Sequence, residues 1–293
     1  MATQIYQAIV DGILVGGVYA LMAVGLTLIF GVLDIINIAQ GILVVLGAYL
    51  SYSLSERLGI DLFVGLLVTV PAMFVLGVAI QWAFIRPLRG RERTSMTLLV
   101  TYAMALIIEG VLYRIYGPDD KQLNARYVTS SVHVLGFYLP YVYLIGFGLA
   151  VAAIAALYLI LYRTTFGRAV RATMQNQAAA RLIGIDVNRV AAVTFGIGTA
   201  VTAVGGMVFG ASSGGFNPNS GYDLISRLLA IIILGGLGSI GGALVASVFM
   251  LTVVSLVDIW SPTWANAVFY AALVLVLLIR PTGFLGRQAV RAQ

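Results

Sequence analysis

Long runs of hydrophobic residues alternate with short polar breaks along the whole chain. The runs cover residues 12–33, 35–54, 62–85, 95–116, 139–162, 190–213, 222–237, 243–257 and 264–279. At about 1.5 Å per helical residue, the first six are long enough to cross about 30 Å of hydrocarbon. The last three are short, so one of them is a candidate half-helix or interrupted span. The pattern predicts an all-α polytopic membrane protein with eight or nine transmembrane helices.

Composition places these runs in a bilayer. Of the 293 residues, 61% are hydrophobic and 10% are charged, whereas a soluble domain carries about a quarter charged residues. So few ionisable side chains cannot cover a globular surface of this size, and the apolar surface requires lipid. We therefore expect a single transmembrane domain, residues 1–293, in the plasma (inner) membrane. Soluble enzymes and DNA-binding domains are excluded, and the net charge of +6 is not evidence for a nucleic-acid partner.

The basic residues are concentrated in three breaks and predict the orientation. Segments 86–93, 163–189 and 280–291 hold twelve of the 17 basic residues, with Glu92 and Asp186 as their only acidic ones. Even numbers of runs separate these segments, so all three can be cytoplasmic under the positive-inside rule. The N-terminus is then outside and the C-terminus cytoplasmic. No basic residue precedes Arg57, so the n-region of a cleavable signal peptide is missing and we expect the first run to be retained.

One polar segment faces outside in this topology, residues 117–138. Residues 126–139 within it mix β-branched and aromatic residues with Ser and Gly, a pattern that fits a small hairpin. A cap over the helix ends is the simpler interpretation of this external loop, and contact with an external partner is the alternative.

The longest cytoplasmic break, residues 163–189, has the composition of a helix lying outside the bilayer. It is rich in alanine, Thr164 and Thr165 suit a helix start, and Gly184 suits a helix end in the left-handed conformation. Such a helix could lie on anionic lipid, insert into a groove of a cytoplasmic partner, or belong to a loop that only sets topology. Its small side chains favour the groove over the lipid surface, because they let a partner's backbone approach closely.

Several strings in the chain resemble known permeases. In the cytoplasmic loop of ABC importer permeases two alanines are followed four residues later by a glycine, as Ala179, Ala180 and Gly184 are here, although Ala178 stands where many permeases carry an acid. The whole string 175–189 resembles the branched-chain amino-acid permease family. Further strings continue the resemblance over nearly the whole chain: GVYAL (17–21), GLTLIFG (25–31), NIAQG (37–41) and LGGLGSIGGA (234–243).

The resemblance implies a permease subunit that forms a pore with a second related permease or a second copy. Two ATPase subunits would dock below, and a soluble binding protein would deliver branched-chain or related amino acids from outside. ATPase closure would push the helix at 165–184 and tilt the fifth and sixth spans. The residues expected at this docking surface are Thr165, Gly167, Arg168, Arg171, Ala178, Ala179, Ala180, Leu182 and Gly184.

The chain lacks the residues of a motor or an enzyme. It has no G-x-x-x-x-G-K-[ST] phosphate loop and its only lysine is Lys121, so ATP hydrolysis is expected in partner subunits. The absence of cysteine and the single histidine, His133, exclude a metal cluster of these ligands, and no cofactor is expected. Residues 236–241 read G-x-G-x-x-G, but two hydrophobic runs flank them and no βαβ unit surrounds them. Glycines there fit a turn or a close helix crossing.

Polar residues and glycine breaks inside the runs are the candidates for the translocation pathway. Gly-interrupted segments at 31–41 and 235–242, one in each half, are typical of transport sites. The pathway candidates are Asn37, Gln40, Glu109, Gly236 and Gly238. Hydrogen bonding between helices is the alternative role for Asn37 and Gln40, and pairing with Arg114 or a neighbouring helix is the favoured role for Glu109.

Two further patterns predict helix contacts. Asp223 and Arg227 are four residues apart and are interpreted as a structural pair near the outer surface. Small-residue faces at Gly12/Gly16 and Gly206/Gly210 predict close helix packing. The alternative function for the chain is a secondary transporter driven by an ion gradient. A membrane-embedded enzyme, the third class, would require clustered His, Asp, Ser or Cys at one depth, which the sequence lacks.

Overall fold

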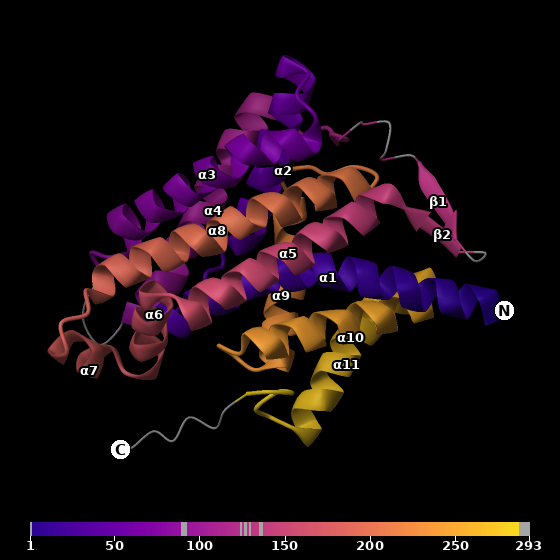
Figure 1. Cartoon of the computed structure of the whole chain (residues 1–293). Helices are drawn as coiled ribbons and strands as arrows, with labels where there is room; N and C mark the ends of the chain where they lie inside the picture. Colours follow the sequence, from indigo (N-terminus) through magenta and orange to yellow (C-terminus); the bar gives the residue numbers. More distant parts are fainter. Residues whose placement is uncertain are drawn as a thin grey trace.

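Long helices account for nearly all of the structure. The computed structural model describes residues 2–88, 93–123, 125, 128, 130–134 and 137–286. Its helices are α1 (Ala2–Leu33), α2 (Gln40–Leu58), α3 (Leu62–Ile80) with a π-helical continuation η1 (Gln81–Ile85), α4 (Arg93–Tyr116), α5 (Tyr141–Arg163), α6 (Thr165–Gln175), α7 (Gln177–Leu182), α8 (Val187–Ser212), α9 (Ser220–Gly235), α10 (Ile240–Asp258) and α11 (Pro262–Ile279). Every hydrophobic run identified in the sequence forms a helix (Figure 1).

Seven helices of the described chain are long and apolar enough to cross a bilayer: α1, α3 with η1, α4, α5, α8, α10 and α11. This number is lower than the predicted eight or nine. The helix α9 has 16 residues and therefore spans about 24 Å, less than the hydrocarbon thickness. The mean hydropathy of α2 is low because its second half contains Ser, Tyr, Glu56 and Arg57. Both helices exist, but neither fits the length and composition of a simple span.

The two exceptional helices lie inside the bundle and start against one another. Gly41 in the first turn of α2 packs on the backbone of Gly221 in the first turn of α9, and a methyl group on Gly41 would overlap the Gly221 carbonyl oxygen. Gln40 also reaches Gly198, near the midpoint of α8. The start of α2 therefore lies at the depth of the middle of α8. At its other end α9 packs on α10, where Gly235 meets Gly242.

Close glycine contacts hold the remaining core together. Gly12 and Gly16 of α1 pack against the backbone of Thr252 and Val248 in α10, and the Ser247 hydroxyl donates a hydrogen bond of 2.9 Å to the Gly16 carbonyl oxygen. Gly206 of α8 packs against the backbone of α2, and Gly210 lies against Ala48 of the same helix. Both predicted small-residue faces are confirmed. The helices α1 and α8 are mostly buried, while α5 and α11 are mostly exposed.

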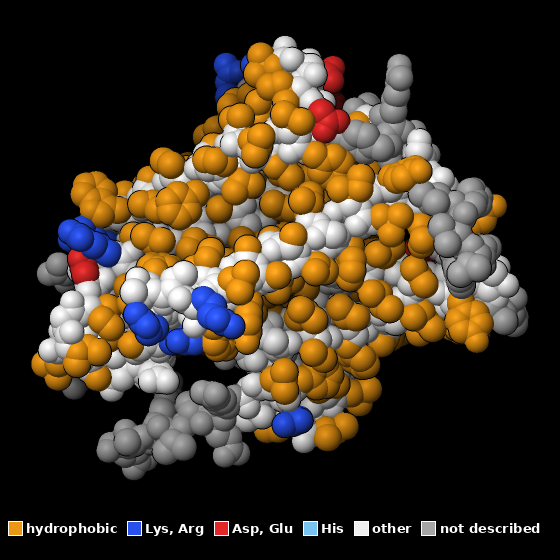
Figure 2. All heavy atoms as spheres, in the orientation of Figure 1, with side chains coloured by type: hydrophobic (Ala, Val, Ile, Leu, Met, Phe, Trp, Pro, Cys, Tyr) orange, Lys and Arg blue, Asp and Glu red, His pale blue; other side chains and the backbone are white. Residues whose placement is uncertain are grey.

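The molecule has two chemically different ends (Figure 1). At the hairpin end, β1 (Ser131–Val134) and β2 (Phe137–Pro140) form an antiparallel pair. There Gln7 bonds the Tyr138 backbone, and Lys121 and Phe216 exchange backbone hydrogen bonds of 2.9 Å. The expected hairpin is confirmed, although residues 126, 127, 129, 135 and 136 lie outside the described residues. The opposite end, the α6–α7 end, carries basic side chains over α6 and neighbouring helix ends (Figure 2).

Candidate functional site

The segment expected to form one docking helix forms two, so the prediction of a single helix over 165–184 is wrong. Thr164 caps α6, its hydroxyl oxygen accepting a hydrogen bond of 3.0 Å from the Gly167 amide. Asn176 adopts an extended conformation and interrupts the helix. Its side-chain oxygen accepts a hydrogen bond of 3.0 Å from the Ala179 amide and so caps α7. Gly184 follows α7 with a φ of +85°, as expected for a left-handed helix end.

Burial divides the expected docking residues into two groups. The exposed residues are Thr165, Arg168, Ala178, Ala179, Leu182 and Gly184, and Arg171 is half-buried over the Tyr162 ring. Gly167 and Ala180 are buried instead. A side chain at Gly167 would overlap carbonyl oxygens at the end of α5, so this glycine lets α6 fold back closely onto α5. These two positions shape the segment from within and offer no surface to a partner.

The most exposed apolar side chains of the α6–α7 segment belong to neighbouring residues. Leu182 is 89% exposed and Ile183 is 73% exposed. They lie at the C-terminal end of α7, the outermost part of the α6–α7 end in Figure 1. Exposed apolar side chains next to a basic residue, here Arg181, are suited to insertion into a groove of another protein.

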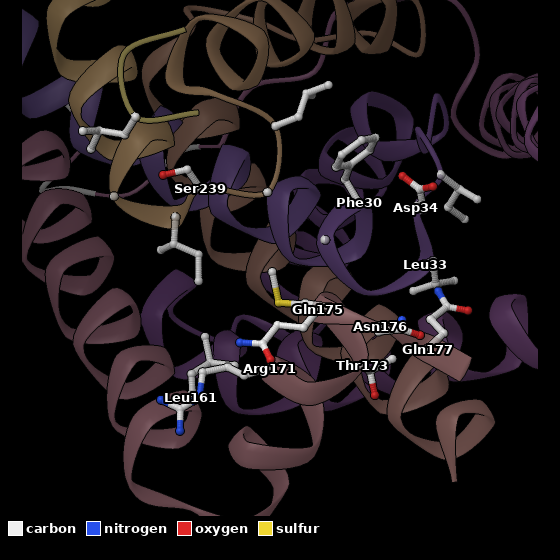
Figure 3. A pocket seen from close by; sticks show the side chains of 18 of the residues that line it. Phe30, Leu33, Asp34, Leu161, Arg171, Thr173, Gln175, Asn176, Gln177 and Ser239 are labelled. Atoms are coloured by element: carbon white, nitrogen blue, oxygen red, sulfur yellow. The ribbon is translucent and has the colours of Figure 1, made fainter. Parts of the chain in front are cut away.

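A cavity of about 950 Å³ separates α6 and α7 from the neighbouring helix ends. Figure 3 shows Phe30, Leu33 and Asp34 from the end of α1 on one side, with Arg171, Gln175 and Asn176 on another. Gly238, Ser239 and Leu285 also line the cavity. Polar and charged side chains contribute much of the lining. The cavity therefore lies between the α6–α7 segment and the ends of α1 and α10.

Two contacts nevertheless join α6 and α7 directly to α1. The Gln177 side-chain amide donates a hydrogen bond of 2.8 Å to the Val32 carbonyl oxygen. The Met174 side chain packs against Gly31, where an added methyl group would overlap the Met174 terminal methyl. Asp34 ends α1 with a φ of +55°, and its amide bonds the Phe30 carbonyl oxygen at 2.8 Å. The last turn of α1 is therefore in direct contact with both α6 and α7.

The glycine-rich string 236–241 forms the turn between α9 and α10. Gly236 and Gly238 have φ values of +97° and +81°, and Ser239 caps α10 through a hydrogen bond of 3.1 Å from the Gly242 amide. Gly236 is buried against Gly286, because the segment after α11 folds back and bonds the carbonyl oxygens at the end of α9. The structural interpretation of these glycines is confirmed. Of the two, only Gly238 faces the cavity.

Asn37 and Gln40 lie in the break between α1 and α2, and both are fully buried. The Asn37 amide donates a hydrogen bond of 3.0 Å to the Gln40 side-chain oxygen, and the Gln40 amide reaches the Gly198 carbonyl oxygen at 3.4 Å. These bonds hold the start of α2 against α8. The pair therefore makes the interhelical contacts that were the alternative to a pathway role.

Glu109 and the polar residues of α9 lie on one exposed face. The Tyr222 hydroxyl donates a hydrogen bond to the Glu109 carboxylate, so Glu109 contacts a neighbouring helix, the role favoured from its sequence. The predicted Asp223–Arg227 pair is not formed. The Arg227 guanidinium instead donates a hydrogen bond of 2.8 Å to the Asn266 side-chain oxygen on α11. Arg227 is therefore hydrogen-bonded to Asn266 on α11 and not to Asp223, one turn away on its own helix.

Several residues of this site carried no readable signal in the sequence. The contacts of Gln177 and Met174 exist only because α6 and α7 approach the end of α1, where Asp34 lies. Ile183 could have been found, because an apolar pair at the end of a basic helix is unusual. The Asn176 cap could also have been found, since asparagine is a preferred N-cap residue.

A bundle with seven candidate membrane spans in its described part is typical of a multi-pass membrane protein. The family model described as "Branched-chain amino acid transport system / permease component" matches residues 8–278. The chain therefore belongs to the family of branched-chain amino acid transport permeases, the membrane components of ABC importers. Members of this family are transport subunits and not enzymes.

Individual relatives cover nearly the full chain. The high-affinity branched-chain amino acid transport system permease protein BraD of Pseudomonas aeruginosa is 29% identical, over 97% of this chain and 96% of the relative. The corresponding protein LivH of Escherichia coli K12 is 30% identical over the same shares. Among solved structures, PsaBC from Streptococcus pneumoniae in complex with Fab has a TM-score of 0.49 and 14% identity, covering 94% and 90% of the two chains.

Proposed function

We propose that this chain forms the translocation pathway of an ATP-driven importer for branched-chain or related amino acids, together with a second permease. Two ATPase subunits dock at the α6–α7 end, and a soluble binding protein docks at the hairpin end. The α6–α7 end is cytoplasmic and the hairpin end is external. The substrate class rests on the family and on the relatives BraD and LivH, whose names specify branched-chain amino acid transport.

One observation carries the docking proposal: Leu182 and Ile183 project from the basic α6–α7 end with 89% and 73% exposure. In lipid such side chains would be buried, and in water alone they would be costly. Their place is the end of a segment that contacts α1 through Gln177. A partner that pulls on this apolar tip therefore moves the last turn of α1.

Reconstitution tests the function. The chain, a second permease, two ATPases and the binding protein are assembled in proteoliposomes, and uptake of radioactive leucine is measured. We expect leucine uptake to require ATP on the side of the membrane that carries the ATPases and the binding protein on the opposite side. Uptake by the permeases alone under an ion gradient would support a secondary transporter and contradict the proposal. An ATP-driven complex that imports another solute would retain the mechanism and change the substrate.

A further inference from the structure

A strip of polar side chains crosses a helix face in the part of the molecule expected inside the bilayer. It comprises Glu109 of α4, then Tyr222, Asp223, Ser226 and Arg227 of α9, and Asn266 of α11. Tyr222, Asp223, Ser226 and Asn266 are exposed, and Glu109 and Arg227 are partly exposed. We call this set the polar strip.

The depth of the polar strip is fixed by the two helices at its ends. Glu109 lies about two turns from the end of α4 at Tyr116, and Asn266 lies about one turn after the start of α11 at Pro262. Both helix ends belong to the hairpin end of the molecule. The polar strip therefore lies about one to two helical turns below the outer ends of these helices, at the depth of the hydrocarbon region of the bilayer.

Lipid is an unsuitable neighbour for this strip. Each charged side chain at such a depth is costly in hydrocarbon, and three ionisable groups lie here, Glu109, Asp223 and Arg227. Asp223 makes no hydrogen bond or ion pair with any other described residue. An exposed carboxylate without a partner requires water or a cationic ligand.

The chemistry of the strip matches a molecule that carries both charges. Asp223 and Arg227 are one helical turn apart, with Cβ atoms about 6 Å from one another, so one amino-acid head group can contact both. The guanidinium has five N–H donors. Asn266 accepts one through Nη2, the buried Tyr19 hydroxyl takes a further hydrogen bond, and the group lies 6.0 Å from the centre of the Phe269 ring, so the remaining N–H groups are available to a ligand. Tyr222 engages one oxygen of Glu109, Oε2. Donors for a carboxylate and acceptors for an ammonium group therefore remain side by side.

The same face of α9 becomes apolar one turn further along. Leu229 is half-buried and Ile233 is 36% exposed, and both follow Ser226 at helical spacing. An aliphatic side chain would find a hydrophobic surface there while its head group remained at Asp223 and Arg227.

We propose that the polar strip is a water-accessible subsite of the translocation pathway that holds the zwitterionic head group of the transported amino acid. Arg227 binds its carboxylate, Asp223 with Glu109 binds its ammonium group, and Leu229 with Ile233 contacts its side chain. This inference rests on the proposed function, since a solute without both charges would have no use for such a strip. It assigns substrate contacts to α9, which the sequence had marked only as a structural pair.

The chain contains no cysteine, which allows a clean accessibility test. Ser226→Cys places one thiol between Asp223 and Arg227 without altering a charge. The variant is assembled into the complete transporter, and its reaction with a membrane-impermeant, cationic methanethiosulfonate is followed from the external side. The reagent requires a water-exposed thiol, because only the thiolate reacts. We expect labelling, and we expect leucine supplied with its binding protein to slow it. At about ten times the half-protecting concentration, labelling should slow roughly tenfold, since only the unoccupied fraction reacts.

Matched variants separate the alternatives. Ile107→Cys on the apolar face of α4, where Ile107 is 64% exposed, should remain unlabelled because it faces lipid. Arg227→Gln and Asp223→Asn, each combined with Ser226→Cys, should still be labelled. Each should raise the leucine concentration for half-protection about tenfold or more, the effect of losing one charged hydrogen bond. Asp258→Asn, an exposed carboxylate at the end of α10, should leave protection unchanged.

The outcomes are decisive. An unlabelled Ser226→Cys would show that the second permease or lipid covers the strip and would overturn the proposal. Labelling without protection by leucine, or protection unaffected by both Asp223→Asn and Arg227→Gln, would also overturn it. Leucine uptake by the wild-type complex is measured in the same preparation. If that uptake is present, such failures refute only the subsite; if it is absent, the proposed function itself fails.

Discussion

The Gln177 side-chain amide of α7 donates a hydrogen bond of 2.8 Å to the Val32 carbonyl oxygen, one residue before α1 ends. These residues are far apart in sequence, and the contact joins the α6–α7 segment to the core helix α1. The helix α1 is largely buried and packs along α10 through Gly12 and Gly16. A displacement of α7 therefore has a direct route to the centre of the bundle.

Removing this bond should weaken coupling without preventing assembly. Gln177→Leu keeps the volume of the side chain but loses the donor, at a cost of about 1 kcal/mol. We expect a complex that hydrolyses ATP normally but imports roughly fivefold less leucine per ATP, measured in proteoliposomes. Gln175→Leu is the control, because Gln175 is exposed and makes no hydrogen bond with other described residues. Equal coupling ratios in both variants would contradict this route.

The apolar tip of α7 should determine ATPase association. Leu182→Asp replaces a side chain that is 89% exposed, so the permease should fold and insert normally while its ATPases no longer co-purify. Leu58→Asp is the matched control, since Leu58 is 67% exposed at the end of α2, near the hairpin end. Retention of the ATPases by Leu182→Asp would place the docking surface elsewhere. Loss of the ATPases by Leu58→Asp would indicate general instability.

The sequence predicts those parts of the structure that depend on local pattern. Hydrophobic runs locate the helices, and the 12/16 and 206/210 glycine pairs locate close packing. Thr164 and Gly184 correctly mark the start of α6 and the end of the segment after α7. These features depend on residues within one or two helical turns. The break at Asn176 was also readable, because an extended asparagine before an alanine run is a typical N-cap.

The parts that could not be predicted depend on contacts between distant residues. Arg227 forms its hydrogen bond with Asn266 and not with Asp223, because α11 packs close to α9 at this position. The inward start of α2 follows from Gln40 reaching Gly198 and from the contact between Gly41 and Gly221. Composition alone makes α2 and α9 resemble weak spans, and only the contact between their first turns shows that both begin inside the bundle.

The contact between the starts of α2 and α9 should be sensitive to a single methyl group. Gly41→Ala would place its Cβ against the Gly221 carbonyl oxygen and close to Ile225, where backbone and core residues cannot easily shift. We expect a loss of roughly 1–3 kcal/mol, seen as a lower melting temperature of the purified permease in detergent. Gly148→Ala on α5 has nothing within 4 Å and should be neutral or slightly stabilising. If the Gly41→Ala variant had the same melting temperature as the Gly148→Ala control, the close contact between Gly41 and Gly221 would be disproved.

The side of the membrane on which the C-terminal segment lies depends on whether α9 completes a crossing. Gln175 of α6 and Leu285, beyond α11, line one cavity, so both should be on the same side, which requires α9 and its preceding segment to cross. Single-cysteine variants of this cysteine-free chain test this in intact cells with an impermeant thiol reagent. Asp119→Cys at the hairpin end should react at once, whereas Leu182→Cys and Leu285→Cys should react only after the membrane is permeabilised. A Leu285→Cys variant that reacts in intact cells while Leu182→Cys does not would show that the chain crosses the membrane an odd number of times between them, and would contradict the placement of both residues on one side. A Leu182→Cys variant that reacts in intact cells would contradict the orientation proposed for the α6–α7 end.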